Sequence, residues 1–457
     1  MDDTQALLEQ IDQTCRRLRM AQTTFGRQAV NDGKFVSRLQ QGGRVTVQTI
    51  ERVHRFIEAQ GGASAPALRS AIHGLRSDVR PEHNFRFYDN RQKYLMFVNT
   101  SSEKQIIADR AIQELAATQP SPPAIRIFDG GAGDGTALAR VLRGMHRHYP
   151  WLPFYVVAKE ISMENIRLTL EKMPDRFQEH PATVLVMTNL KYSEAPQLAP
   201  GSPVAASSMI WHEVALKGTT AGEFEEEING LEGFLAQHWQ ASISPTSGNP
   251  VYQKPVVLVI HRQDQRFPLD SVLPRRGYAR ADFDFVLLSQ PYRAKSPLEF
   301  KASRVVAPLV RALRPGGKLL GVHSHGDDPG LEIIRSIWPE ENPFVTDRGP
   351  LMAAVKSELG EAARDFKFHT QPDSRALFRY DIRTLPNEID ALSDMGSSTV
   401  FAAWNAATYV AQIEDRQLAA AMSNDRYLDA TREVLRRHRG LWFNDEVYII
   451  SRKAALG

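Results

Sequence analysis

Residues 124–136 have amino-acid types at a spacing that could bind a ligand. A short apolar run ends in Asp129, and three glycines follow at alternate positions, Gly131, Gly133 and Gly135. The residues after them have helical spacing. A strand that breaks into a glycine-rich turn and continues as a helix lets a cofactor lie against bare backbone at the helix N-terminus. We therefore expect this turn to bind a cofactor.

The glycine spacing distinguishes this turn from the dinucleotide-binding fingerprint. That fingerprint places its second and third glycines three apart, with an acid about 20 residues further on. Here the last two glycines are two apart, and an acid closes the strand itself. This version resembles motif I of the class I S-adenosylmethionine (SAM)-dependent methyltransferases. The resemblance implies that Asp129 holds the amino-acid end of SAM, directly or through water, and that Gly131, Ala132, Gly133 and Gly135 line the cofactor.

A second acidic residue, Glu160, stands at the end of the next predicted strand, 154–158. A carboxylate offers two oxygens to two donors, so it can accept both ribose hydroxyls of a nucleoside. The resemblance implies this role for Glu160, with Ile161 beside it; the alternative is a surface carboxylate. It also implies that Thr188 and Asn189, which follow the third predicted strand, lie against the adenine edge.

A third motif, Ser289-Gln290-Pro291-Tyr292, follows the predicted fourth strand. It resembles the Asp/Asn/Ser-Pro-Pro-Tyr signature of methyltransferases that act on amino groups of adenine, cytosine or glutamine side chains. The resemblance implies that Ser289 and the Gln290 carbonyl accept hydrogen bonds from the target amine and that Tyr292 stacks on a planar substrate. Gln290 departs from the signature, which favours proline or an aliphatic residue there. The alternative is an ordinary turn after a strand.

Histidines supply the remaining polar candidates. His323 and His325 lie in a His-Ser-His-Gly-Asp-Asp string, but a metal site is not expected, because the final histidine of a metallohydrolase string is absent. We expect His323 or His325 to line the substrate pocket as a base or hydrogen-bond partner. Weaker candidates, each of which could equally serve packing, are His212-Glu213 and the helical set Trp404, Asn405 and Tyr409.

Strand-like and helix-like segments alternate from residue 124 onwards. The expected strands are 125–128, 154–158 and 183–187, and the expected helices are 136–146 and 163–172. This pattern indicates a βαβαβ half of an open parallel sheet. The predicted fold class is α/β: a Rossmann-like, doubly wound, mostly parallel sheet with a final antiparallel strand, plus an N-terminal helical module and a helical cap insertion.

Two pairs of segments compete for the fourth and fifth strands. One pair is 204–214 with 256–261, and the other is 283–288 with 318–322. We favour the second pair, because Leu-Arg-Pro-Gly-Gly-Lys ahead of 318–322 resembles the methyltransferase sequence that leads into the fifth strand. Residues 196–280 would then hold an insertion or added strands. If 256–261 were instead the third strand, Asp264 would replace Asn189 as the adenine contact.

Residues 1–62 predict a separate helical module. One helix would bury Phe25 with Ala29 and Val30, a turn would follow, and a second helix would bury Phe35, Val36 and Leu39 while exposing Lys34, Ser37 and Arg38. The arrangement resembles the helix-turn-helix of phage-repressor-type regulators, whose second helix reads a DNA groove. The alternative is a helical packing module without DNA, since few basic residues here could contact phosphates.

The other predicted parts follow from these motifs. Residues 63–123 would be a linker and lid helices, because the aromatic-rich stretch 84–110 precedes the cofactor strand and often folds over the cofactor in methyltransferases; core packing is the alternative. Residues 124–330 would form the SAM-binding core, 331–440 a mostly helical substrate-cap region, and 441–457 the final core strand.

Composition limits the class of protein. The chain has 457 residues, 24% charged and 42% hydrophobic, as a soluble globular protein of two or three units would have. No apolar run approaches a membrane span. The single cysteine, Cys15, excludes an internal disulfide and a cysteine-based zinc site, so a cytoplasmic enzyme is expected. A net charge of +3 is too small to imply nucleic acid, so any basic surface would be local.

These observations predict a SAM-dependent methyltransferase whose cofactor is S-adenosyl-L-methionine and whose partner is a small-molecule substrate. The alternative is a nucleic-acid amino-methyltransferase that binds DNA through the N-terminal module. A third interpretation is a DNA-binding regulator that senses SAM. No membrane partner is expected, and a homodimer is compatible with the sequence.

Overall fold

The computed structural model describes residues 3–18, 20–30, 32–40, 49, 53, 56–57, 91–244, 249–383 and 395–454. The chain divides into two compact units, Met1–Glu82 and His83–Gly457, and each is described by itself. The predicted linker and the start of the predicted lid segment, up to residue 90, lie outside the described residues. None of the described helices combines the length and the apolar composition needed to cross a bilayer.

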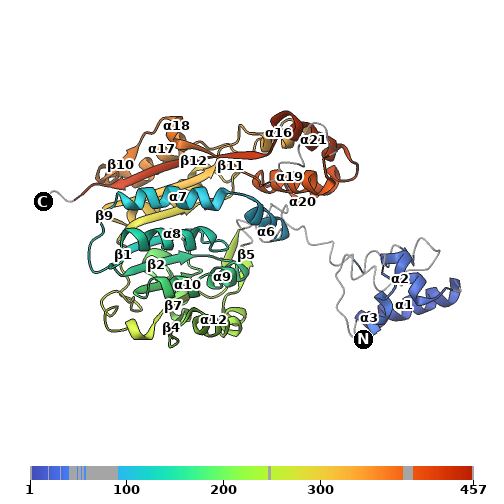
Figure 1. Ribbon diagram of the computed structural model, residues 1–457, viewed down its shortest axis with the longest axis horizontal. Helices are drawn as coiled ribbons and strands as arrows, with labels where there is room; N and C mark the ends of the chain where they lie inside the picture. The colour runs from blue at the N-terminus through green and yellow to red at the C-terminus, as the bar shows by residue number, and fades with distance from the viewer. Residues whose placement is uncertain are drawn as a thin grey trace. The chain divides into compact units, whose positions relative to one another are not determined.

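The first unit is helical. Its described helices are α1 (Asp3–Leu18), α2 (Gln22–Val30) and α3 (Phe35–Gln40) (Figure 1). Phe25, Phe35 and Leu39 are buried in one small core, and Lys34 and Arg38 are exposed, as the spacing predicts. Arg38 forms an ion pair with Asp32 at 2.7 Å, so this charge already has a partner on the chain. A DNA-binding role for this unit stays a prediction.

One ten-stranded sheet organises the second unit. Its strands are β1 (Ile125–Asp129), β2 (Phe154–Lys159), β3 (Thr183–Thr188), β4 (Ile210–Leu216), β7 (Val256–Arg262), β8 (Phe283–Ser289), β9 (Leu313–Ser324), β10 (Phe366–His369), β11 (Leu377–Asp381) and β12 (Trp442–Arg452). The order is β10-β12-β9-β8-β1-β2-β3-β7-β4, with β11 also pairing with β12. A separate ribbon joins β5 (Ala241–Ile243) to β6 (Pro250–Tyr252).

Most of the sheet is parallel. Strands β3, β2, β1, β8 and β9 run in one direction, and β12 runs antiparallel to β9. Residues on both faces of β1, β2, β3 and β8 are buried, which explains their near-continuous apolar sequences. The predicted fold class, a Rossmann-like sheet with a final antiparallel strand, is confirmed.

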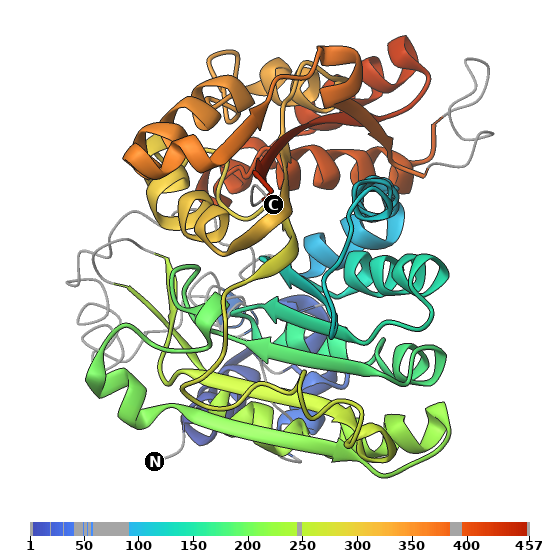
Figure 2. The ribbon, with the colours of Figure 1, turned by 90° about the vertical axis from the view of Figure 1, so that its left-hand side faces the viewer.

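Helices cover both faces of this sheet (Figures 1 and 2). Apolar residues of α7 (Glu103–Ala116), α8 (Thr136–His148), α9 (Met163–Leu170), α10 (Pro174–Glu179), α12 (Ala221–Asn229) and α13 (Glu232–His238) pack in one core. A second core contains η3 (Lys301–Val306), α15 (Ala307–Arg311) and α17 (Arg348–Leu359). The remaining short segments are η1 (Ala195–Gln197), α11 (Pro203–Ser208), η2 (Gln263–Gln265), α14 (Leu298–Phe300), η4 (Gly360–Asp365) and α18 (Asp373–Ala376).

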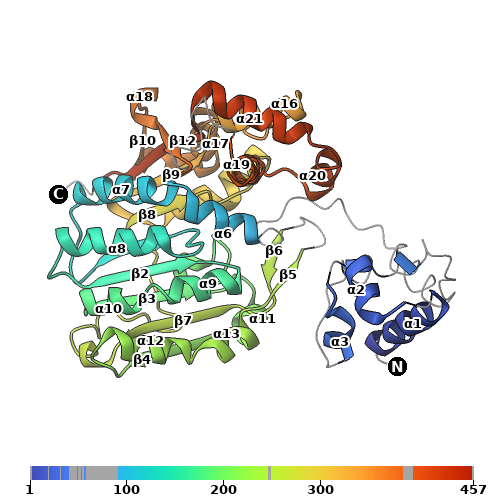
Figure 3. The ribbon, with the colours of Figure 1, turned by 45° about the vertical axis from the view of Figure 1, so that its right-hand side comes forward.

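A third core lies beside one end of the sheet. It joins α6 (Arg91–Thr100), α16 (Pro329–Ile337), α19 (Ser397–Val410), α20 (Asp415–Ala421) and α21 (Arg426–His438). Figure 3 shows α6 next to α19, although the two are about 300 residues apart in the sequence. The predicted cap region 331–440 is therefore mostly helical, but its strands β10 and β11 pair with β12 of the main sheet.

The favoured fourth and fifth strands are β8 and β9, since β8 pairs with β1 and β9 pairs with β8. The Pro-Gly-Gly turn lies inside β9 as an irregularity rather than before it, with Gly316 at φ 80°. Residues 196–280 hold added strands, as expected: β7 pairs antiparallel with β3, and β4 extends that edge.

Candidate functional site

The glycine-rich turn lies where the sequence places it, at the carboxyl end of β1. Asp129 ends the strand and its Oδ1 accepts a hydrogen bond from the Gly131 N–H at 3.2 Å. Gly133 and Gly135 have positive φ values of 56° and 78°, which glycine adopts without the steric cost of a Cβ. A Cβ built on Gly131 would meet one neighbour, the Ser289 carbonyl oxygen at 3.5 Å. The backbone is therefore bare at Gly131, which faces the end of β8, whereas Tyr94 and Thr169 lie against Gly133 and Gly135.

Glu160 follows β2 and holds this loop. Its Oε2 accepts from the Gly133 N–H at 3.0 Å and from Asn165 Nδ2 at 3.3 Å. Its Oε1 accepts from the N–H groups of Ile161 at 2.7 Å and Ser162 at 2.9 Å. A carboxylate has about four acceptor sites, so all are in use. A ribose would bind Glu160 only by replacing contacts such as those on Oε2.

Asp129 is buried beside a buried lysine. Desolvation raises the pKa of Asp129 to about 6, although the Gly131 N–H and the Lys104 ammonium both lower it. Lys104 comes from the first turn of α7 and pairs with Glu103 at 3.1 Å. The negative charges of Glu103, Asp134 and Asp445 raise the pKa of Lys104 despite its burial. Lys104 is therefore a permanent cation next to the cofactor turn.

The aromatic segment before β1 closes over the turn. Tyr94 of α6 accepts the Asp134 N–H at 2.9 Å, and its hydroxyl donates to Asp134 Oδ1 at 3.3 Å. A Cβ added at Gly133 would lie 2.7 Å from that hydroxyl. Tyr94 packs on Tyr409 of α19, with ring centroids 6.0 Å apart. These contacts agree with the predicted lid, and they bring the predicted residue Tyr409 to the site.

Thr188 and Asn189 do not face the turn. The Thr188 hydroxyl donates to the Val256 carbonyl at 2.8 Å. Asn189 accepts from the Val256 N–H at 2.8 Å and donates to the Lys254 carbonyl at 2.9 Å. Both side chains therefore join β3 to β7, and their predicted contact with adenine gains no support. Asp264, the alternative adenine contact, is excluded by the strand direction. Because β7 runs antiparallel to β3, Asp264 lies at the opposite end of the strands, where it pairs with Arg262.

Ser289 and Gln290 do lie at the turn. Ser289 is 7% exposed, and its hydroxyl has no hydrogen-bond partner among the described residues. Gln290 has a positive φ of 49°, unusual for a residue with a Cβ. Its side chain is held by its Oε1, which accepts from the Ser324 N–H at 3.2 Å. Gln290, which departs from the Pro-Pro-Tyr signature, thus has a specific position between β8 and β9.

Tyr292 and His323 form a buried chain with Glu446 of β12. The Tyr292 hydroxyl lies 2.7 Å from His323 Nδ1, and His323 Nε2 lies 2.6 Å from Glu446 Oε1. Glu446 accepts from the Arg348 N–H at 2.6 Å and from Arg348 Nη1 at 2.8 Å. Burial raises the pKa of Glu446, but the hydrogen bonds from His323 and Arg348 outweigh it and lower the pKa. Tyr292 is 7% exposed, so its ring is not presented for stacking on a substrate.

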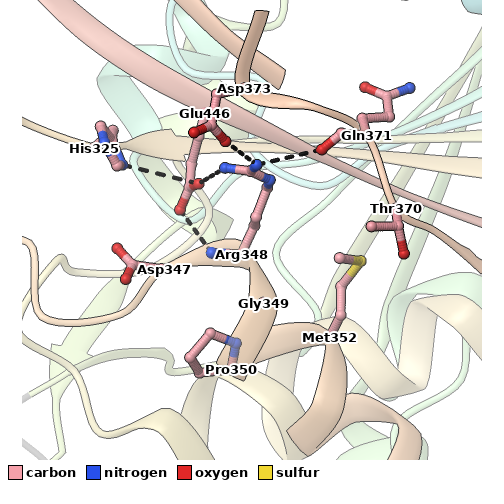
Figure 4. Close-up of a pocket in the computed structure, with 10 residues that line it drawn as sticks. All are labelled: His325, Asp347, Arg348, Gly349, Pro350, Met352, Thr370, Gln371, Asp373 and Glu446. Atoms are coloured by element: carbon pink, nitrogen blue, oxygen red, sulfur yellow. Dashed lines mark hydrogen bonds and ion pairs between the residues drawn. The ribbon is translucent and has the colours of Figure 1, made fainter. Parts of the chain in front are cut away.

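A cavity of about 360 Å³ opens on the far side of Glu446 (Figure 4). His325, Asp347 and Glu446 place possible ligand atoms within 4.8 Å of one another there. Arg348, however, already donates to both oxygens of Glu446 and also pairs with Asp373. The guanidinium supplies the countercharge that a metal ion would supply. The cavity is lined by His325, Asp347, Arg348, Gly349, Pro350, Met352, Thr370, Gln371, Asp373 and Glu446.

The weaker candidates are placed elsewhere. Trp404 is fully buried and stacks on Trp338 at 5.8 Å, so it serves packing. Asn405 lies one residue further along α19 and is also buried. His212 and Glu213 lie on the edge strand β4, where Glu213 pairs with His261 and Arg266.

Glu103, Lys104, Asp445 and Glu446 also belong to this site, although the motifs in the sequence do not include them. A signal for two of them exists, because Asp445 and Glu446 are adjacent acids in an otherwise mostly apolar final strand. Buried acids in a strand need partners, so such a pair indicates a polar site. Glu103 and Lys104 lie in the segment that was interpreted as a lid.

Comparisons with known proteins find likeness in the fold alone. No family model matches the chain, and no curated protein matches it. Among solved structures, a geranyl diphosphate methyltransferase with GPP and sinefungin has a TM-score of 0.28 and 10% identity, covering 77% of this chain and 78% of that one. A putative sarcosine dimethylglycine methyltransferase from Galdieria sulphuraria has a TM-score of 0.27 and 12% identity, covering 77% and 85%. At these values the likeness carries no argument about activity.

Proposed function

We propose that this protein is a SAM-dependent methyltransferase that transfers the SAM methyl group to a small-molecule nucleophile. The observation that carries the proposal is the turn at 129–135. It leads from β1 into α8, leaves bare backbone at Gly131, and is hydrogen-bonded to Glu160 at the end of the neighbouring strand. This is the arrangement in which a nucleoside cofactor lies across the carboxyl ends of parallel strands.

The charges around the turn fit SAM. SAM carries a sulfonium, an ammonium and one carboxylate, so it has a net positive charge. Five carboxyl side chains are buried at or next to the turn, and the lysines whose charges act on them include Lys104, Lys159 and Lys172. In the proposed complex Asp129 accepts from the SAM ammonium, and Lys104 pairs with its carboxylate. The five acids are Asp129, Asp134, Glu160, Glu103 and Asp445.

The reaction proposed is an in-line attack by the substrate on the sulfonium methyl. The leaving thioether is neutral, so the protein chiefly aligns the reactants and excludes water. Ser289 lies beside Gly131 and is proposed to orient the acceptor. Tyr292 hydrogen-bonds to His323, and His323 hydrogen-bonds to Glu446, so we propose Tyr292 and His323 as positioning residues for the ends of β8 and β9 rather than as a base.

Aromatic enclosure favours a small substrate. Tyr94, Phe97 and Tyr409 pack together next to the turn, with Phe97 and Tyr409 centroids 5.0 Å apart. A site closed by side chains suits a small molecule better than a polymer. The nucleic-acid alternative rests on the N-terminal helices and on the Ser289–Tyr292 motif. Arg38 of those helices is already paired with Asp32, and the Tyr292 ring is buried.

Two measurements test the proposal. Calorimetry with SAM and with S-adenosylhomocysteine should show binding of both by the full chain. Incubation with methyl-labelled SAM and a cell extract should then place the label in the small-molecule fraction. Absence of SAM binding would overturn the proposal, label in nucleic acid would favour the alternative substrate, and SAM binding without transfer would favour the regulator.

A further inference from the structure

Two buried carboxyl groups from distant parts of the chain meet beside the proposed SAM turn. Glu103 of α7 is 2% exposed and Asp445 of β12 is fully buried. Gln290 joins them: its Nε2 lies 3.5 Å from Glu103 Oε1 and 3.2 Å from Asp445 Oδ1. The same Nε2 lies 3.1 Å from the Ser324 hydroxyl. We refer to Glu103, Gln290, Ser324 and Asp445, with the adjacent Ser289, as the acceptor cluster.

This cluster has more acceptors than donors. The Gln290 amide nitrogen carries two hydrogens but faces three acceptor atoms. Asp445 Oδ2 and the Ser289 hydroxyl, both more than nine-tenths buried, have no hydrogen-bond partner among the described residues. An unpartnered buried polar atom costs free energy that a bound donor would recover. The chemistry that the cluster lacks is therefore an N–H donor or a cation.

The charge of the cluster also indicates that it can bind a cation. Lys104 pairs with Glu103, and Lys104 is also drawn to Asp129 and Asp134 of the turn. One ammonium thus faces carboxyl groups on two sides. Burial and the charge of Glu103 raise the pKa of Asp445 well above its ordinary value. A second positive charge at the cluster would let Asp445 ionise.

Aromatic side chains stand next to these acids. Burial raises the pKa of Tyr409 well above its ordinary value, and the charges of Glu103, Asp134 and Glu160 raise it further. Burial also raises the pKa of Tyr380, and the charges of Asp445 and Glu103 raise it further. Phe97 packs on both, with centroids 5.0 Å from Tyr409 and 6.1 Å from Tyr380. Carboxylates combined with aromatic faces are the surroundings in which alkylammonium groups bind.

We propose that the acceptor cluster binds the substrate of the methyl transfer and that this substrate is a small aliphatic amine, recognised by Glu103 and Asp445 under Tyr409. The inference rests on the proposed function, whose cofactor turn lies against the same residues. Ser289 links the two sites, because its carbonyl faces Gly131 and it precedes Gln290 in the chain, and its buried hydroxyl has no hydrogen-bond partner among the described residues.

The chemistry balances with groups on the chain. An alkylammonium ion has no lone pair, so it first gives one proton to the Asp445 carboxylate and becomes a neutral amine. The nitrogen lone pair then forms a bond to the sulfonium methyl carbon, the carbon–sulfur bond breaks, and its electron pair stays on sulfur as S-adenosylhomocysteine. The product is the N-methylated ammonium ion, which leaves with its positive charge.

A binding experiment on the full chain tests the inference with matched probes. Choline and its uncharged carbon analogue 3,3-dimethylbutan-1-ol have the same shape, and benzylamine and benzyl alcohol form a second pair. With S-adenosylhomocysteine bound, at least one cation should bind about tenfold or more tightly than its neutral counterpart. Equal binding within both pairs, or no binding of either cation, would overturn the inference.

Variants separate this inference from the proposed function. Asp445→Asn keeps the side-chain shape and should weaken binding of the preferred cation about tenfold, a larger loss than any change in SAM affinity. The control is Asp284→Asn, a fully buried acid at the start of β8, paired with Arg314 away from the turn. Melting curves check that both variants fold. Unchanged cation binding in folded Asp445→Asn would overturn the amine assignment, whereas loss of SAM binding by the wild-type chain would overturn the proposed function instead.

Discussion

Glu160 Oε2 accepts the Gly133 N–H at 3.0 Å, so the acid that follows β2 holds the glycine turn that follows β1. The two residues come from neighbouring parallel strands, and this bond fixes the turn before any ligand arrives. The same carboxylate also accepts three other hydrogen bonds. Glu160 therefore has two roles in the proposed site: it shapes the turn and it can receive the ribose hydroxyls.

The first prediction concerns Glu160. Glu160→Ala removes a charged acceptor from the turn and from the ribose, and hydrogen bonds to charged groups contribute about 1.5–3 kcal/mol each. We expect the dissociation constant for SAM to rise on the order of 10-fold to 100-fold. Calorimetry measures this directly. Glu164→Ala, on the next helix turn, is the control and should bind SAM like the wild type; an unchanged constant for Glu160→Ala would remove the ribose role.

The second prediction concerns Gly133. Gly133 has a φ of 56°, and a Cβ there would lie 2.7 Å from the Tyr94 hydroxyl. Gly133→Val should therefore displace Tyr94 and distort the turn, and so abolish SAM binding, because valine resists this φ and its side chain collides with the Tyr94 hydroxyl. Equilibrium binding of labelled SAM measures the effect.

The control for Gly133 is another glycine. Gly222 lies on α12, where an added Cβ would meet nothing within 4 Å. Gly222→Val should leave SAM binding intact. If Gly133→Val also bound SAM normally, the turn would not be the cofactor site.

The third prediction uses the pKa of Asp129, which burial raises to about 6. The carboxyl group is ionised above this value and neutral below it, so its attraction for the SAM ammonium is present at neutral pH and is lost as pH falls. We expect SAM affinity to fall by up to about tenfold per pH unit below pH 6, as one linked proton requires. Calorimetry across this range measures the slope.

Asp129→Asn is the matched variant for this pH dependence. It keeps the acceptor for the Gly131 N–H but cannot ionise. Its SAM affinity should be weaker at neutral pH and nearly constant below it. A wild-type affinity that does not change through pH 6 would mean that Asp129 does not hold the ammonium.

The strand, turn and helix at the proposed site could be predicted because the sequence pattern that defines them lies within one short stretch. The β1 strand, the turn and α8 are written in one continuous stretch, where an apolar run, alternate glycines and helical spacing follow each other. The inward residues of α2 and α3 were likewise predicted from helical spacing, because a short amphipathic helix has one way to bury its apolar stripe.

The parts that could not be predicted depend on contacts between distant residues. Asn189 was assigned to adenine because it follows a strand, but its amide bonds to Lys254 and Val256, since β7 pairs with β3 in the antiparallel sense. Glu103 and Asp445 are more than 300 residues apart; the pairing of β12 with β9 and the packing of α7 on the sheet together bring them to one amide. The spacing of apolar residues within one segment does not show which distant residues come into contact.

The last prediction compares two acids that bind the same arginine. Arg348 pairs with Glu446, whose side chain is 1% exposed, and with Asp373, whose side chain is 74% exposed. Removing one partner of a fully buried ion pair costs about 3–5 kcal/mol, whereas an exposed pair contributes about 0–1 kcal/mol. The Arg348 side chain is 18% exposed and keeps Asp373 when Glu446 is removed, so we expect a cost between these limits. Glu446 also accepts from His323, so its loss breaks the chain to Tyr292 as well.

We therefore expect Glu446→Gln to lower the free energy of unfolding by about 1.5–3 kcal/mol and Asp373→Asn to change it by less than about 1 kcal/mol. Urea denaturation at neutral pH measures both. Because hydrogen bonds lower the pKa of Glu446 in the folded chain, its contribution is present above the unfolded pKa and is lost as pH falls through the folded value. The difference in the free energy of unfolding between the two variants should thus become smaller at acidic pH. Equal effects of the two substitutions at neutral pH would contradict a structural role for the buried chain from Arg348 to Tyr292.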